Sequence, residues 1–263
     1  MPAPDAISCD KLAKLIGTSK SPQIFDLRDD AILLIPGARS VDRHSLISED
    51  AGSIVVVCAH GGADSQGAAA LLRSKGMAAE YLEGGYQAWE EAHLPVFDGS
   101  KLTCRDEAGR SLWVTRARPK IDRIACPWLI RRFIDPRAVF LYVSPSEVLA
   151  VAERLGAAPF DVEAAFWSHD GDRCTFDKMI AEFGLNLPAL DRLATIVRGA
   201  DTARPDLAPE CAGLIAASLG LSRMFTDDLA QLEAGMGLYD AFYRWARDAT
   251  GETHNWPANK VTT

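Results

Sequence analysis

The segment WVTRARPKIDRIACPWLIRRFIDP, residues 113–136, predicts a strand and a helix in direct succession. The apolar and β-branched run over 112–117 is typical of a strand, and Pro119 ends it. From Ile121 onward the apolar residues recur three and four positions apart, as on one buried face of a helix. Pro127 must either kink this helix or begin its second part.

This segment is strongly basic in an acidic chain. The chain carries a net charge of −8, whereas the segment holds six cations, Arg116, Arg118, Lys120, Arg123, Arg131 and Arg132. Such a local excess indicates an anionic partner, either the protein's own carboxylates or a bound anion. Both alternatives are open from the sequence. In the second, we expect Arg116, Lys120 and Arg123 to bind a small inorganic oxyanion.

Composition narrows the class of protein. Of 263 residues, 48% are hydrophobic and 24% charged, which is typical of a globular protein. The net charge of −8 argues against nucleic acid as a partner, because phosphate contacts need a basic face. The N-terminus lacks the pattern of a signal peptide, and no apolar run is long enough for a membrane helix. The six cysteines form no CxxC pair, so we expect reduced thiols in a cytoplasmic protein that binds no membrane.

The first part of the chain alternates between strand and helix patterns. QIFDLR (23–28), SIVVVC (53–58) and AEYL (79–82) are typical of short buried strands. Amphipathic helices are expected after Ser8 and over 66–76. The alternation predicts an α/β domain with a parallel sheet and flanking helices.

Three segments follow from these patterns. The α/β domain takes residues 1–98, and a polar stretch with two glycines predicts a linker over 99–111. Residues 112–263 form the second domain, which we expect to be mainly helical, of the α+β class. Its other predicted elements are a strand at 138–143 and helices at 188–198, 209–219 and 227–248, the last capped by Thr226.

Cys58 is the candidate nucleophile of the first domain. It lies where a predicted strand ends and the loop AHGGADS leads into a helix. Backbone N–H groups that converge at such a loop, together with the helix dipole, favour an anion and lower a thiol pKa. The alternative is a small buried hydrophobe at the end of a strand.

This domain resembles the rhodanese family of sulfurtransferases. The resemblance rests on DLRDD (26–30), IPGARSVD (35–42), the cysteine loop and YLEGGYQAW (81–89). It implies that Cys58 accepts a sulfane sulfur as a persulfide, and that the loop residues His60, Gly61 and Ser65 support it.

The loop departs from the family's pattern in its charge. The family has an arginine five residues after the cysteine, where this chain has Ala63, and the next position is Asp64. A carboxylate beside a thiolate or an oxyanion is unfavourable. His60 could supply part of the missing charge. The departure argues against thiosulfate as the sulfur donor and leaves open a domain used only for binding.

A second candidate cluster lies in FWSHDGDRCTF, residues 166–176. The sequence predicts two short strands, AAFW and CTF, joined by a turn at Asp170-Gly171. The turn region contains four residues of types that bind metals, His169, Asp170, Asp172 and Cys174, but their spacing matches no zinc motif. The alternative is an ordinary turn, because aspartates are common beside a glycine in turns.

Residues 112–257 resemble the C-terminal domain of the chromate-resistance protein family. The resemblance rests on the segment 113–136, HDGDRCTFD, LDRLATIVRGADT and FTDDLAQLEAGMGLYDAFYRWA. Family members often have histidine where this chain has Arg198, which weakens any metal site that uses that position. The candidate metal ligands are Asp122, His169, Cys174 and Asp201, and their mixed donors could suit iron, manganese or zinc.

Three functions are compatible with these features. The first is a sulfurtransferase-like protein of the chromate or oxyanion response, in which Cys58 carries sulfur and the second domain binds an oxyanion or a metal. The second is a metal-dependent redox or detoxifying domain. The third is a non-catalytic sensor or interaction protein with a degenerate loop. The expected partners are a small inorganic oxyanion or a sulfur carrier.

Overall fold

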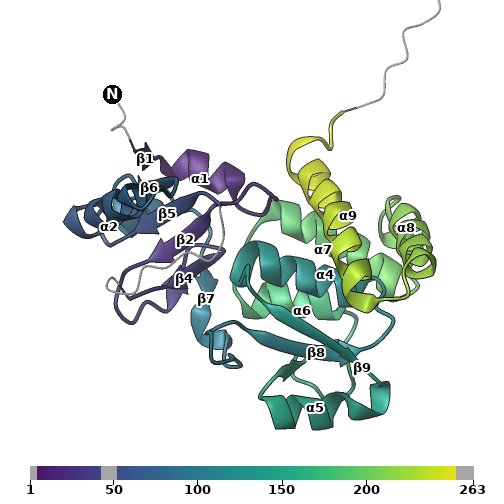
Figure 1. Ribbon diagram of the computed structural model, residues 1–263. Helices are drawn as coiled ribbons and strands as arrows, with labels where there is room; N and C mark the ends of the chain where they lie inside the picture. The colour runs from purple at the N-terminus through teal and green to yellow at the C-terminus, as the bar shows by residue number, and fades with distance from the viewer. Residues whose placement is uncertain (1–4, 43–51, 253–263) are drawn as a thin grey trace, which may run out of the picture.

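The computed structural model describes residues 5–42 and 52–252, and Figure 1 shows a sheet-containing half beside a mainly helical half. The first half is built on a five-stranded sheet of order β1-β6-β5-β2-β4, in which every pair is parallel. Its strands are β1 (Ala6–Ile7), β2 (Gln23–Asp26), β4 (Ala38–Ser40), β5 (Ile54–Val57) and β6 (Ala79–Leu82). The predicted α/β class of this half is confirmed.

Three helices cover this sheet: α1 (Cys9–Leu15), α2 (Ala63–Ser74) and α3 (Gly85–Glu91). Ser8 caps α1 as predicted, since its side chain accepts a hydrogen bond from the Lys11 amide. β5 is fully buried, which explains its uninterrupted β-branched sequence. α2 packs Ala69 and Leu72 against one face of the sheet.

The stretch between the halves is folded. β3 (Leu33–Leu34) pairs antiparallel with β7 (Phe97–Asp98), and a 3₁₀ turn follows over Gly99–Lys101. Farther along, Arg105 and Ser111 form an isolated bridge. The predicted linker at 99–111 therefore packs along the protein and leads directly into the second half.

The second half joins a small parallel sheet to a group of helices. The sheet has the order β10-β8-β9, with β8 (Leu112–Arg116), β9 (Val139–Val143) and β10 (Ala158–Pro159). The helices are α4 (Asp122–Leu129), α5 (Val148–Leu155), α6 (Thr175–Glu182), α7 (Pro188–Asp201), α8 (Cys211–Met224) and α9 (Asp228–Asp248). Short 3₁₀ turns lie at Pro145–Glu147 and Pro205–Leu207. In the described part of the chain, no helix has the length and apolar character needed to cross a membrane.

α4 is the central helix of this half. Pro127 lies within it, and the helix continues to Leu129 before a π-helical turn over Ile130–Ile134. Every residue of α4 except Arg123 is buried, and α4 lies between α6 and α9 (Figure 1). Trp128 packs at tilted angles against aromatic rings of α6 and α9.

Three sequence predictions for this half are wrong. CTF is not a strand, because Thr175 and Phe176 begin α6, with Cys174 as the N-cap residue in a capping box with Asp177. AAFW contributes only an isolated bridge between Phe160 and Trp167, so the predicted hairpin does not form. The cap of α9 is Asp227 rather than Thr226, since the Asp227 carboxylate accepts the Ala230 amide at 2.7 Å.

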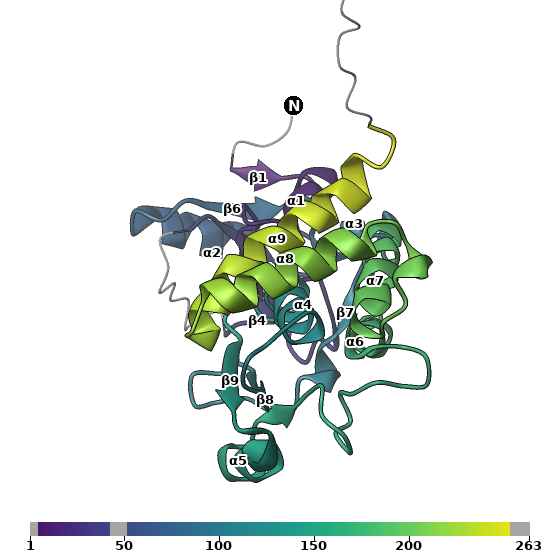
Figure 2. The same ribbon diagram turned by 90° about the vertical axis from the view of Figure 1, so that its right-hand side faces the viewer.

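The two halves share one hydrophobic core. A single cluster of buried residues includes Leu12 and Trp89 from the first half and Trp128 and Tyr243 from the second. Gly17, after α1, meets the second half at close range, because a Cβ atom there would lie 2.4 Å from Phe133 Cζ and 2.8 Å from Tyr243 Cε1. In addition, Arg247 of α9 donates to the Lys14 carbonyl at 3.2 Å. Figure 2 shows α9 running towards α1.

We expect Gly17→Ala to destabilise the protein by about 1–3 kcal/mol more than Gly76→Ala, because it forces an extra carbon into this shared core. Both glycines have positive φ values, +75° and +84°, but a Cβ atom at Gly76 meets nothing within 4 Å. The control therefore carries the same backbone strain without the contact. Urea unfolding measures both free energies, and equal losses would show that the Gly17 contact is not a tight one.

Candidate functional site

Cys58 lies in a cradle of hydrogen-bond donors at the end of β5. Its side chain is 7% exposed, and its Sγ lies 3.1 Å from Ser65 Oγ in the first turn of α2. Burial raises the pKa of the Cys58 thiol, but the Ser65 hydroxyl and the N–H groups of Ser65, His60 and Gly62 outweigh it. The pKa is therefore lowered, as a sulfur nucleophile needs.

Two glycines allow the loop to form this cradle. Gly61 has φ +66°, and a Cβ atom there would lie 2.7 Å from the Leu82 carbonyl oxygen. A Cβ atom at Gly85 would lie 2.4 Å from the Cys58 carbonyl oxygen. The Tyr86 amide also donates to that oxygen at 2.9 Å, so α3 holds the cysteine loop in place. Only glycine fits where the two backbones approach so closely.

The remaining loop residues surround the cradle from outside. The His60 side chain is exposed, and its Nδ1 forms a hydrogen bond of 2.7 Å with Oε1 of Gln87 in α3. α2 begins at Ala63, three residues before the predicted start, which puts Asp64 in its first turn. The structure thus brings together Cys58, Gly61 and Ser65, with His60 at the edge.

The cations of residues 116–132 are bound mostly by the protein's own acceptors. Arg116 and Arg123 both pair with Asp161, at 3.0 and 3.2 Å, whereas Lys120 is exposed. The others follow the same pattern: Arg131 pairs with Glu233, Arg132 with Asp240, and Arg118 donates to the carbonyls of Ser222 and Phe225. Binding of an external anion by Arg116, Lys120 and Arg123 stays a prediction.

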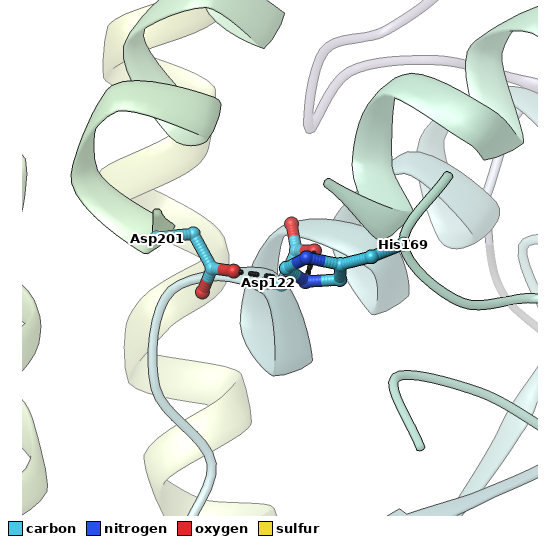
Figure 3. Close-up of side chains that lie close together, drawn as sticks. All are labelled: Asp122, His169 and Asp201. Atoms are coloured by element: carbon cyan, nitrogen blue, oxygen red, sulfur yellow. Dashed lines mark ion pairs between the residues drawn. The ribbon is translucent and has the colours of Figure 1, made fainter. Parts of the chain in front are cut away.

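A second site lies in the other half, where carboxylates surround one imidazole. The Nε2 atom of His169 lies 3.2 Å from an Asp201 oxygen, 3.5 Å from an Asp161 oxygen and 3.7 Å from an Asp122 oxygen. In Figure 3, Asp122 and Asp201 both face the His169 ring. We call Asp122, Asp161, His169 and Asp201 the carboxylate–histidine cluster.

Four elements position this cluster. Asp122 begins α4, Asp201 ends α7, and Asp161 follows β10. The Thr175 amide at the start of α6 donates to Asp122 at 2.7 Å, and the Thr175 hydroxyl donates to Asp161 at 3.3 Å. The residue before Asp122, Ile121, has φ +37°, and Asp161 itself has φ +51°. Such strained backbone is held by its surroundings and is often found at functional sites.

Burial and like charge act together on these carboxyl groups. Asp122 is fully buried, and that burial, together with the charges of Asp201 and Asp161, raises its pKa. Burial and the charge of Asp161 also raise the pKa of Asp201, against the effect of His169. Neighbouring carboxylates of this kind need a cation among them to stay in the charged form.

Of the predicted metal ligands, the structure brings three together and leaves Cys174 aside. Asp122, His169 and Asp201 can each offer one ligand atom within 4.8 Å of the others. Cys174 Sγ instead donates to Asp177 at 3.3 Å, and Asp177 also accepts from Arg198 at 2.7 Å. Burial raises the pKa of the Cys174 thiol. Arg198 therefore belongs to the capping arrangement of α6 and lies outside the cluster.

Sequence reasoning missed Asp161. It lies eight positions before His169, outside any recognisable motif, and its partners come from β8, α4 and α6. The available signal in the sequence was an acidic residue directly after a short apolar run. Asp170 and Asp172, by contrast, are exposed.

Comparison with known proteins identifies relatives of both halves. The model of the ChrB C-terminal domain matches residues 113–246, and the model of the rhodanese-like domain matches residues 8–92. Protein ChrB of Cupriavidus metallidurans is 34% identical over 137 residues, which is 50% of this chain and 39% of that protein. Thiosulfate sulfurtransferase GlpE of Pseudomonas fluorescens is 41% identical over 75 residues, 25% of this chain and 68% of that protein.

Solved structures resemble the first half. A rhodanese-related protein from Thermoplasma volcanium is 25% identical and covers 35% of this chain and 97% of its own, with a TM-score of 0.32. A rhodanese-like domain protein from Staphylococcus aureus is 29% identical over 33% of this chain and 91% of its own, with a TM-score of 0.29. The predicted resemblances of the two halves are thus confirmed by the matches to the family models.

We expect the pH profile of Cys58 alkylation to have its midpoint below that of Cys9 in the same chain. The pKa of Cys58 is lowered by its cradle, whereas burial and the charge of Asp10 raise the pKa of Cys9. At neutral pH, Ser65→Ala should slow alkylation of Cys58 roughly fivefold, the equivalent of one hydrogen bond of about 1 kcal/mol. The measurement is iodoacetamide labelling followed by mass spectrometry of the separate peptides.

The matched control is Ser74→Ala, which removes a hydroxyl at the other end of α2 that bonds only the Leu71 carbonyl. This variant should keep the wild-type profile. A Cys58 midpoint at or above that of Cys9 would contradict the cradle's effect.

Proposed function

Because the chain belongs to the ChrB C-terminal domain family and carries a rhodanese-like domain ahead of it, we propose that it is a sulfur-carrying protein of chromate resistance. The chain spans 39% of the length of its Cupriavidus relative, so the activity is argued from this chain's own residues. The observation that carries the proposal is the cradle of Cys58.

The cradle supports chemistry at sulfur. A persulfide on Cys58 adds one anionic sulfur beyond Sγ, and anions are stabilised by converging N–H groups at the start of a helix. The N–H groups of His60, Gly62 and Ser65 already surround the thiolate. The same donors that lower the thiol pKa would therefore stabilise the loaded form.

The transfer step is a displacement at sulfur. The Cys58 thiolate attacks the outer sulfur of a donor persulfide, R–S–SH, and a bond forms between Sγ and that sulfur. The donor's S–S bond breaks, and its electron pair leaves with the inner sulfur as a thiolate, RS⁻. The proton stays on the transferred sulfur or passes to water, and neither an oxidant nor a reductant is consumed.

The charge of the loop selects the donor class. Asp64 lies in the first turn of α2, where the family has a cation at this end of the loop. A carboxylate there disfavours the thiosulfate dianion, because like charges repel at short range. A thiol-based donor, either a small persulfide or a persulfide on another protein, has less negative charge to bring to the loop.

We expect the purified protein to gain the mass of one sulfur atom per chain when incubated with a small-molecule persulfide. Cys58→Ser should lose this gain, because no other thiol lies in the cradle. Cys9→Ser is the matched control and should load as the wild type does, since its thiol has a raised pKa. Intact-protein mass spectrometry measures the loading, and equal loading of Cys58→Ser would refute the sulfur-carrying function.

A second candidate function is the binding of the oxyanion itself, and one cavity favours it. A cavity of about 530 Å³ is lined by four arginines, Arg110, Arg131, Arg132 and Arg137. The first three have carboxylate partners, whereas Arg137 Nε is buried without a hydrogen-bond partner among the described residues. A buried donor of this kind favours an acceptor from outside, and guanidinium groups suit tetrahedral dianions such as chromate.

We expect Arg137→Gln to weaken binding of chromate or sulfate at least about tenfold, since it removes a charge-assisted hydrogen bond. Arg154→Gln is the matched control, because Arg154 is an exposed arginine on α5, outside the cavity. Isothermal titration measures the affinity. Equal affinity in wild type and Arg137→Gln would remove this cavity as the oxyanion site and would leave the sulfur chemistry of Cys58 untouched.

A further inference from the structure

One imidazole nitrogen in the second half has more acceptors than it can satisfy. His169 Nε2 lies within 3.7 Å of oxygens from three aspartates. A protonated Nε2 has a single hydrogen, so it can donate one good hydrogen bond. Three anionic oxygens around one nitrogen are the arrangement of ligands around a shared cation.

The distances agree with that arrangement. Two donor atoms about 2.1–2.2 Å from one ion and at 90–110° to each other lie about 3.0–3.6 Å apart. The oxygens of Asp201 and Asp161 are 3.2 and 3.5 Å from His169 Nε2, and that of Asp122 is 3.7 Å away. Two of the three distances fall in the range, and the third exceeds it by a tenth of an ångström.

Asp122 provides an independent indication of a missing partner. Its side chain is 0% exposed, and its Oδ2 accepts the Thr175 amide, but its Oδ1 has no hydrogen-bond partner among the described residues. An unpartnered buried carboxylate oxygen is costly unless a cation or a donor reaches it. Figure 3 shows this carboxylate facing His169, so the side chain with the unpartnered oxygen belongs to the cluster, with its Oδ2 nearest the imidazole.

We propose that Asp122, His169 and Asp201 of the carboxylate–histidine cluster bind one divalent metal ion of the Mn²⁺ or Fe²⁺ class. Two carboxylates and one imidazole form a donor set that is mainly hard oxygen with a single nitrogen, which suits these ions better than a soft metal. The Cys174 thiol lies beside Asp122, but it donates to Asp177 and is not among the ligands.

The arginines around Asp161 complete the site. Arg116 and Arg123 both contact the Oδ2 atom of Asp161, whereas its Oδ1 atom faces His169. The hydrogen bond from Arg116 and the ion pair with Arg123 fix the outer oxygen, and so hold the inner one beside the ligand His169, as outer partners of metal ligands do. They also offset part of the negative charge of three neighbouring carboxylates.

The metal would be open to small molecules on one side. His169 is 40% exposed, and together with Asp161 and Arg116 it lines a cavity of about 430 Å³. Three protein ligands leave three positions of an octahedral ion for water or a small anion. Arg116 lies on the wall of that cavity and is placed to contact an anion bound there. This is the layout of a reactive metal site rather than a closed structural one.

The test is titration of the metal-free full-length protein with Mn²⁺, followed by electron paramagnetic resonance of the unbound ion. We expect one Mn²⁺ per chain, with a rise in the melting temperature and an enhanced relaxation rate of water protons from the open positions. His169→Gln and Asp201→Asn should each weaken binding at least about tenfold. His169 is partly exposed, so its replacement should leave the fold intact, and circular dichroism checks this.

Asp172→Asn is the matched control, because this exposed carboxylate lies three residues from His169 but outside the cluster. It should bind Mn²⁺ as the wild type does. Absence of binding, or an equal affinity in His169→Gln, would overturn the proposal and leave His169 as a hydrogen-bond partner of the aspartates. Cys58→Ser should bind Mn²⁺ as the wild type does, so the metal site and the sulfur chemistry of Cys58 are tested independently of each other.

Discussion

The buried carboxylate of Asp122 is the constraint around which the second half is arranged. It begins α4, it is 0% exposed, and it accepts the amide that starts α6. The backbone just before it is also fixed, because Tyr239 donates to the Ile121 carbonyl and Gln231 to the Pro119 carbonyl, both from α9. A carboxyl group that has no contact with water needs partners supplied by the fold. α4, α6 and α9 therefore meet around this residue.

The basic segment that contains Asp122 serves mainly to hold α4 among its neighbours. Arg132 forms two hydrogen bonds of 2.8 Å with Asp240, which also accepts Trp128 Nε1. Arg131 pairs with Glu233 on the same helix, α9. These pairs are partly buried and geometrically defined, so they fix the position of α9 on α4 more than they add stability. Most of the positive charge in the segment is thus paired with acceptors of the protein itself.

The two candidate sites use opposite electrostatics. At Cys58, hydrogen-bond donors converge on a single sulfur and stabilise negative charge there. In the carboxylate–histidine cluster, negative groups converge on one imidazole, and their mutual repulsion favours a cation. The shared core joins the halves that carry these sites, and Gly17 at its contact leaves no room for a side chain. One chain therefore presents a thiol among hydrogen-bond donors and an oxygen-rich site on a common framework.

The sequence by itself determined the parallel sheet, the strand–loop–helix around Cys58 and most helices, because these depend on local periodicity and capping. Asp122, His169 and Asp201 were also found, since each lies in a segment with a recognisable pattern. Tertiary structure decided what local pattern cannot express. It moved Cys174 into the cap of α6, brought in Asp161, and gave the arginines their acceptors. Those outcomes depend on side chains that are far apart in the chain, and only packing around a buried charge brings them together.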